Sequence, residues 1–330
     1  MLFAAGGTAT CGSRDLGRIA GMTADATPQL DLFADSRDVM LCNDAIEALW
    51  RRDAAGAVAA QHALAGFAPE HHALAALPVL IDAMVTNGRT PFDAHDELAA
   101  ARRHLAQRVA PAAQALLAGR AASWLAPLWA RLAERAAGLA FRGTHADDHA
   151  APLWLLAREP AAAIDAVQRI ESWRRIPVPL GWMVQARHAR DGLDAIWPML
   201  VELAWLAPAR WAQCCDVLAD PLLGRLRRRF EAEYDDATAD ADADPGATSE
   251  PDAPDTQVWF PGWVLNHQPA LLPTLRQAQP GQDTVPERVF RVMAELLGLE
   301  RQGRHAELIE HRKRLRGLQP VLYSIYMRTR

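Results

Sequence analysis

Helical periodicity is the feature that most limits what this chain can fold into. Between residues 35 and 226, leucine, alanine and tryptophan recur at spacings of three and four residues, whereas runs of β-branched residues are scarce. That spacing gathers apolar side chains on one face of a helix, while a half-buried strand needs strict alternation. The pattern therefore predicts an all-α fold. One such stripe consists of Trp124, Leu125, Leu128, Trp129, Leu132 and Ala136.

Helix-breaking residues interrupt the pattern at intervals that predict helices of about 12–20 residues. The expected breaks fall at Asp53, 66–69, 88–91, Gly143, Pro160, Pro177, Gly192, Pro208 and Pro221.

Three segments share one order of features, which is an apolar helix, a turn residue, a second helix and a closing proline. The closing prolines follow the turn residues by 16, 16 and 17 residues. This order resembles the tetratricopeptide helix-turn-helix. Because the copies are unevenly spaced, the resemblance implies an irregular tetratricopeptide-like solenoid of helical hairpins. Each segment has a turn residue, a small residue, a leucine and a proline, in that order. They are Asp53, Ala57, Leu64 and Pro69 in the first segment, Gly192, Ala195, Leu203 and Pro208 in the second, and Gly303, Ala306, Leu315 and Pro320 in the third.

The second of these hairpins gives a specific packing expectation. Its side chains should lie between two antiparallel helices that are joined at Gly192. The side chains in question are Trp182, Ala186, Ala195 and Leu203.

An acidic segment divides the chain. Residues 231–258 contain ten acidic residues and no lysine or arginine, and without those ten acids the rest holds 35 basic and 30 acidic residues. Such a composition cannot bury enough apolar surface to order itself, so a disordered linker is expected over residues 235–256. The expected organisation is a flexible tail over 1–34, a helical body over 35–234, this linker, and a C-terminal helical segment over 257–330 that packs on the body.

The N-terminal tail contains a short segment of functional interest, residues 29–33, here named the QLDLF segment. It resembles the clamp-binding motif of bacterial replication and repair proteins, in which Gln-Leu-Ser/Asp-Leu-Phe docks into a hydrophobic cleft of the DNA polymerase III sliding clamp. The resemblance covers five residues and implies a partner, with Gln29 as the polar anchor at the cleft. It further implies that Leu30 supports the contact, that Asp31 occupies the tolerant position, and that Leu32 and Phe33 form the hydrophobic plug. In the alternative interpretation, the three apolar side chains pack on the protein's own first helices.

Catalytic motifs are scarce. No nucleotide-binding or nucleophile-elbow pattern is present, and no strand is expected that would hold one. The strongest metal candidate consists of His145, Asp147, Asp148 and His149, whose imidazoles and carboxylates can ligate a divalent ion. The alternative is that these polar residues cap the next helix. We therefore expect a non-enzymatic protein without a cofactor, with a metal-dependent hydrolase as the remote alternative.

Basic and aromatic residues allow two interpretations. Tryptophans interleaved with arginines can stack single-stranded nucleic acid, but their helical spacing favours a packed core or a protein interface. These residues are Trp154, Trp173, Trp182, Trp197, Trp205 and Trp211 with Arg174, Arg175, Arg187 and Arg210. The densest basic run can contact DNA phosphate, or the adjoining acidic segment can neutralise it. This run consists of Arg225, Arg227, Arg228 and Arg229.

Cysteine usage and hydropathy bear on location. The four cysteines form no C-x-x-C pair, and the neighbouring Cys214 and Cys215 are expected to be a buried pair of small residues. No apolar run approaches the ~20 residues of a membrane span.

Translation is suspected to begin at Met22, which would place the QLDLF segment almost at the N-terminus. A cytoplasmic location is expected, near the nucleoid if the clamp is bound.

Together these features predict an adaptor for DNA replication or repair. The QLDLF segment would bind the sliding clamp, and the helical-repeat body would recruit a second protein. The alternative is a helical-repeat scaffold unrelated to replication, in which the QLDLF segment packs on the protein itself.

Overall fold

The computed structural model describes the backbone of residues 27–86, 88–242 and 255–330, and the side chains of 37–86, 88–239 and 255–330. These residues are predominantly helical and contain no β-strand, which confirms the all-α prediction. The suspected start at Met22 lies outside the described residues. The chain divides into two compact units between Leu74 and Ala75.

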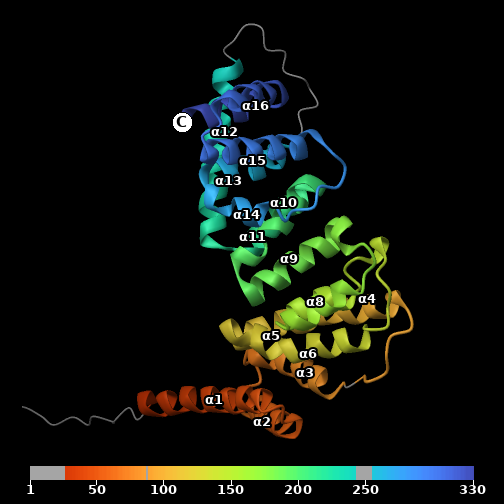
Figure 1. Cartoon of the computed structure of the whole chain (residues 1–330). Coiled ribbons are helices and arrows are strands. Elements are labelled where there is room, and N and C mark those ends of the chain that lie inside the picture. Colours follow the sequence, from red (N-terminus) through yellow and green to blue (C-terminus); the bar gives the residue numbers. More distant parts are fainter. Residues whose placement is uncertain (1–26, 87, 243–254) are drawn as a thin grey trace, which may run out of the picture. The chain divides into compact units, whose positions relative to one another are not determined.

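The first unit is a hairpin of α1 (Thr27–Trp50) and α2 (Ala54–Phe67), which lie side by side (Figure 1). Asp53 starts α2, because its carboxylate accepts a hydrogen bond from the backbone N–H of Gly56 at 2.9 Å. Ala57 and Leu64 of α2 are fully buried, as are Ala45 and Leu49 of α1. The first expected hairpin is therefore present, and its small residue and leucine are buried.

The second unit begins with helices that pack mostly on their neighbours in sequence: α5 on α6, α6 on α7, α7 on α8 and α8 on α9. Five residues between α4 and α5 have π-helical hydrogen bonding, which widens this long helix locally. The elements are α3 (Ala73–Val85), α4 (His95–His104), η1 (Leu105–Val109), α5 (Ala110–Leu117), η2 (Ala118–Arg120), α6 (Ala121–Arg135), η3 (Gly143–His145), α7 (Ala150–Leu156), α8 (Pro160–Gln168), η4 (Trp173–Arg175) and α9 (Pro177–Asp191).

The C-terminal half of this unit is built around α13, in which Phe260, Trp263 and Leu265 are all buried. The helices α10, α12, α15 and α17 contact α13, so contacts here are not limited to neighbours in sequence. The elements are η5 (Leu193–Ala195), α10 (Trp197–Leu206), α11 (Pro208–Leu218), α12 (Pro221–Asp242), η6 (Thr256–Trp259), α13 (Phe260–His267), η7 (Pro269–Leu271), α14 (Leu272–Leu275), α15 (Val285–Gln302), α16 (His305–Leu318) and α17 (Pro320–Arg328).

Gly192 and Gly303 end α9 and α15 as expected, with φ of 81° and 68°, a region that favours glycine. Trp182, Ala186 and Leu203 are buried, but the expected burial of Ala195 is wrong. Ala195 lies in the short 3₁₀ turn η5, on the exposed side. Ala306 is likewise exposed in the first turn of α16. A small residue therefore packs within the hairpin in the first copy only.

Two helices extend into segments that were expected to be irregular. α12 continues to Asp242, so residues 235–242 of the expected linker are helical. The cause is the spacing of Phe230, Tyr234 and Ala237, which are buried one turn after another where α12 packs against α17.

α1 begins at Thr27, so the backbone of residues 27–34, which were expected to form a tail, is helical. Pro28 is the second residue of α1, and proline is favoured in a first helical turn because its φ already fits and its missing N–H is not needed there.

Among the helices in the described part of the chain, none combines the length and apolarity that a membrane crossing requires.

Candidate functional site

The QLDLF segment occupies the first turns of α1, and its side chains lie outside the described ones. α1 has 24 residues and α2 has 14, so at 1.5 Å per residue α1 is longer by roughly 15 Å. Phe67, the last residue of α2, lies beside Arg37, whose guanidinium carbon is 5.0 Å from the centre of the Phe67 ring. The end of α2 therefore lies beside Arg37, which follows the QLDLF segment by four residues along α1. The segment falls in the part of α1 that projects past α2 (Figure 1).

Burial along α1 follows the same division. Between residues 37 and 50, the first buried side chain is Cys42. Val39 and Met40, which lie between the QLDLF segment and Cys42, are 53% and 63% exposed. Among the described side chains of α1, burial thus begins nine residues after Phe33.

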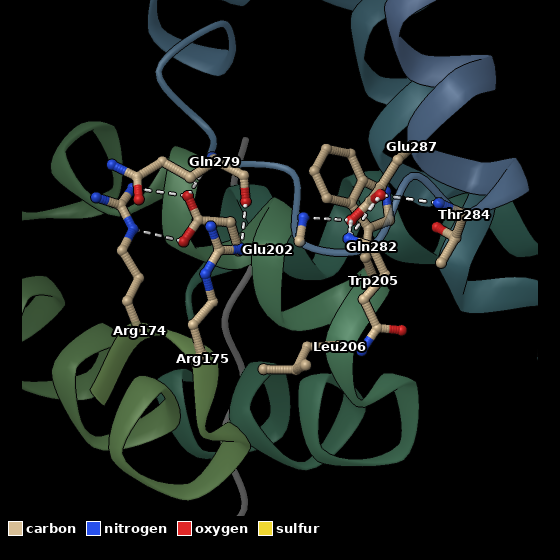
Figure 2. Close-up of a pocket in the computed structure, with 10 residues that line it drawn as sticks. Arg174, Arg175, Glu202, Trp205, Leu206, Gln279, Gln282, Thr284 and Glu287 are labelled. Carbon is tan, nitrogen blue, oxygen red and sulfur yellow. Dashed lines mark hydrogen bonds and ion pairs between the residues drawn. The ribbon is translucent and has the colours of Figure 1, made fainter. Parts of the chain in front are cut away.

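A polar pocket in the second unit lies where η4, α10 and the loop between α14 and α15 meet (Figure 2). Glu202 is its central residue and is 4% exposed. Its two carboxylate oxygens accept hydrogen bonds from Nε and Nη2 of Arg174, both at 2.6 Å. One of them also accepts the backbone N–H of Gln279 at 2.7 Å. This bidentate pair satisfies the buried charge and fastens the loop to α10.

A second buried carboxylate, Glu287 of α15, holds the other end of the same loop (Figure 2). It accepts the backbone N–H groups of Gly281 at 2.7 Å and of Thr284 at 2.9 Å. Both carboxylates therefore have short, geometrically good partners. The remaining cavity of about 150 Å³ is far smaller than a pocket for a typical organic ligand. We interpret this pocket as an anchor for the loop, because both carboxylates accept hydrogen bonds from the loop backbone.

The residues proposed for a metal make contacts of other kinds. His149 caps α7, because its Nδ1 accepts the backbone N–H of Ala151 at 3.2 Å, and its ring is parallel to that of Trp182 at 5.7 Å. Asp148 is buried and pairs with Arg102 Nε at 2.8 Å. His145 Nδ1 is 3.7 Å from Oδ2 of Asp148. In the described part of the chain, no three histidine, cysteine or acidic side chains gather as metal ligands would. The geometry favours the helix-cap interpretation.

His149 is held in its neutral form. The pKa of His149 is lowered from 6.5 to about 4, chiefly by burial and in smaller part by the nearby Arg169 and His95. A neutral ring is what the cap requires, since a protonated imidazole has no acceptor nitrogen.

Two of the four arginines of the basic run on α12 pair with carboxylates. Arg227 contacts Asp216 at 2.7 Å and Glu231 at 3.0 Å. Arg229 contacts Glu233 at 2.7 Å. Arg225 and Arg228 are exposed. Neighbouring carboxylates therefore offset part of the positive charge that was considered for phosphate contact.

Trp182, Trp197 and Trp211 are buried, which confirms the core interpretation for these three, while Trp154, Trp173 and Trp205 are half-buried.

Cys214 and Cys215 are also buried. Burial raises the pKa of each thiol to about 12. The reactive thiolate is therefore disfavoured at neutral pH, and neither residue is suited to nucleophilic chemistry.

Comparison with known proteins gives no match, whether to protein-family models, to curated proteins or to solved structures.

Proposed function

We propose that this protein is a non-enzymatic adaptor that binds the bacterial DNA polymerase III sliding clamp through the QLDLF segment. The observation that carries the proposal is the projection of α1 past the end of α2. The five residues that resemble the clamp motif lie beyond Arg37, and among the described side chains of α1, those of 37–50, the first buried one is Cys42. A docking segment has to be accessible, and a helix backbone that extends past the end of the other helix of the hairpin supports this requirement.

Binding at a cleft would exploit the apolar side chains of Leu30, Leu32 and Phe33. Full burial of each contributes roughly 1.5–3 kcal/mol, of which ordering or remodelling the segment consumes a part. A single motif of this kind is therefore expected to bind modestly.

The body of the protein is proposed to recruit a second protein. Its helices turn at Asp53, Gly192 and Gly303 in the order of tetratricopeptide-like hairpins, and such hairpins commonly present extended binding surfaces. The non-enzymatic part of the proposal is supported by Glu202 and Glu287, whose carboxylates are both occupied. The proposed function does not include direct DNA binding, because Arg227 and Arg229 already pair with carboxylates.

The test is a double substitution, Leu32→Ala with Phe33→Ala, measured for clamp affinity and for thermal stability. Docking side chains act only in the complex, so clamp binding should fall at least about tenfold while the melting temperature stays nearly unchanged. If these side chains pack on the protein itself, each truncation instead costs about 2–5 kcal/mol of stability.

The matched control is Val39→Ala with Met40→Ala, which removes two exposed apolar side chains from the same helix outside the motif. This variant should bind the clamp like the parent protein. An equal loss of clamp binding in both variants would indicate non-specific hydrophobic binding by α1. Loss of stability in the Leu32/Phe33 variant, with no clamp binding by the parent, would favour the scaffold unrelated to replication.

A further inference from the structure

The second unit contains an apolar groove that the clamp interaction does not use. It lies among α3, the α4–η1 helix and α6, and it has a volume of about 330 Å³. Leu105, Val109, Leu128 and Leu132 contribute buried apolar side chains to it. Ala100, on the neighbouring turn of α4, is exposed at its edge.

Two features of the sequence leave this groove open. The lining positions on the facing helices are small, namely Ala83 on α3 and Ala100 and Ala101 on α4. The π-helical turn η1 lies directly beneath, and its first and last residues, Leu105 and Val109, both line the groove. A π-helical turn inserted in an α-helix is energetically unfavourable and is frequently found at functional sites.

At one end the groove continues into a basic basin. Arg131 and Arg135 line both cavities, and Arg89 lines the basin. Arg135 is fixed in place, because its Nε donates to the carbonyl oxygen of Thr90 at 2.7 Å and its guanidinium lies 3.8 Å from the centre of the Phe92 ring. Within the described part of the chain, no carboxylate pairs with Arg89 or Arg135.

The charges around the two cavities favour an anionic occupant. Three guanidinium groups face two carboxylates, Asp82 at the groove and Glu134 at the basin. Asp82 also accepts a hydrogen bond from the Thr86 hydroxyl at 3.4 Å. His104, exposed on α4, also lines the groove. A ligand that fits must therefore bring apolar side chains for the groove and acidic groups for the arginines.

The geometry points to this groove as the docking site for an acidic amphipathic helix of a partner protein. Grooves between helices commonly accept the apolar face of such a helix, which presents side chains at i, i+3, i+4 and i+7. The carboxylates on the flanks of the helix would pair with Arg89 and Arg135. This inference rests on the part of the proposed function that gives the body a second partner, and it is independent of clamp binding.

The test uses two synthetic helix-forming peptides of about fifteen residues. Both carry leucine at the four helical positions, and one has glutamate on its flanks where the other has lysine. Fluorescence anisotropy with the full chain should show binding of the glutamate peptide, at least about tenfold tighter than the lysine peptide, with a preference that weakens as salt is added. Equal binding of the two peptides, or no binding of the glutamate peptide, would overturn the inference.

Two pairs of variants locate the binding. Ala100→Trp fills the groove and should abolish binding of the glutamate peptide, whereas Ala106→Trp, at an exposed position of η1 outside the groove, should not. Arg89→Glu should weaken binding by about tenfold, whereas Arg108→Glu, at an exposed position of η1 outside both cavities, should change it little. Binding that survives both Ala100→Trp and Arg89→Glu would mean that the peptide docks elsewhere.

Failure of this inference is distinguishable from failure of the proposed function. Ala100→Trp should leave clamp binding unchanged, and the Leu32/Phe33 double variant should leave peptide binding unchanged. If the clamp binds but the glutamate peptide does not, the groove inference is wrong and the clamp proposal stands.

Discussion

Acidification should destabilise the second unit through His149. The neutral ring caps α7 through its contact with Ala151 and is parallel to Trp182. Protonation removes the acceptor nitrogen and puts a buried positive charge near Arg169. For these reasons the pKa of His149 falls from 6.5 to about 4 on folding.

The sign and size of the effect follow from that pKa. Between about pH 6.5 and pH 4 the unfolded chain binds a proton at His149 that the folded protein does not, so lowering the pH favours unfolding. The stabilisation is fully present above pH 6.5 and is lost as the pH falls toward 4. At about 1.4 kcal/mol for each pKa unit, a fall of roughly 2.5 units corresponds to about 3 kcal/mol.

The assay compares urea unfolding of the parent protein with that of His149→Asn, followed by circular dichroism from about pH 7.5 to about pH 4.5. Asparagine retains a capping oxygen and does not titrate. Burial also lowers the pKa of His267, but that residue is present in both proteins and its effect cancels in the difference. The parent should lose more stability than the variant, by up to about 3 kcal/mol as the pH approaches 4.

A parallel loss in the two proteins would refute the reasoning. It would mean that the His149 ring titrates normally in the folded state, and therefore that it neither caps α7 as a neutral acceptor nor avoids solvent beside Trp182.

Three further predictions concern other parts of the structure. Glu202→Ala should destabilise the protein by roughly 1–3 kcal/mol in urea unfolding, because it leaves the half-buried Arg174 guanidinium and the backbone N–H of Gln279 without their acceptor, and Glu202→Gln should cost less. Gly303→Ala should cost about 1 kcal/mol because φ is 68° there, whereas Gly317→Ala, within α16 and with open space around it, should stabilise by a few tenths to 1 kcal/mol. Iodoacetamide labelling followed by peptide mass spectrometry should find Cys214 and Cys215 unmodified at neutral pH until denaturant is added, since burial raises the pKa of both to about 12.

The parts of the fold that follow from local chemistry could be predicted from the sequence. Helices were expected from periodicity, and the turns at Asp53, Gly192 and Gly303 were expected from residues whose side chain or φ suits a helix end. Each of these effects acts within a few residues. The local sequence is therefore enough to predict these helices and their ends, and the structure confirms them.

The contacts that build the pocket could not be predicted in this way. Glu202 joins Arg174, 28 residues earlier, and Gln279, 77 residues later. Nothing in the local sequence distinguishes this glutamate from an exposed one, apart from its place in the apolar run of α10. That place is the one available signal, because a charged residue among buried neighbours requires a partner.

Composition was misleading where spacing was informative. The acidic count of residues 231–258 favoured disorder from residue 235, yet Tyr234 and Ala237 continue the buried stripe of α12. Tyr234 also accepts a hydrogen bond on its hydroxyl from Gln319 Nε2 at 3.1 Å. Two apolar positions one turn apart are enough to extend a helix when another helix lies against them, however many exposed acids surround them.

The two proposed binding sites belong to different units of the protein. The QLDLF segment belongs to the first unit and the groove to the second, and each unit has its own buried residues. Substitutions at independent sites usually have additive effects. A protein that carries Leu32→Ala, Phe33→Ala and Ala100→Trp together should therefore lose clamp binding and peptide binding each to the extent seen in the separate variants. A departure of more than about 0.5 kcal/mol from additivity would show that occupation of one site is communicated to the other.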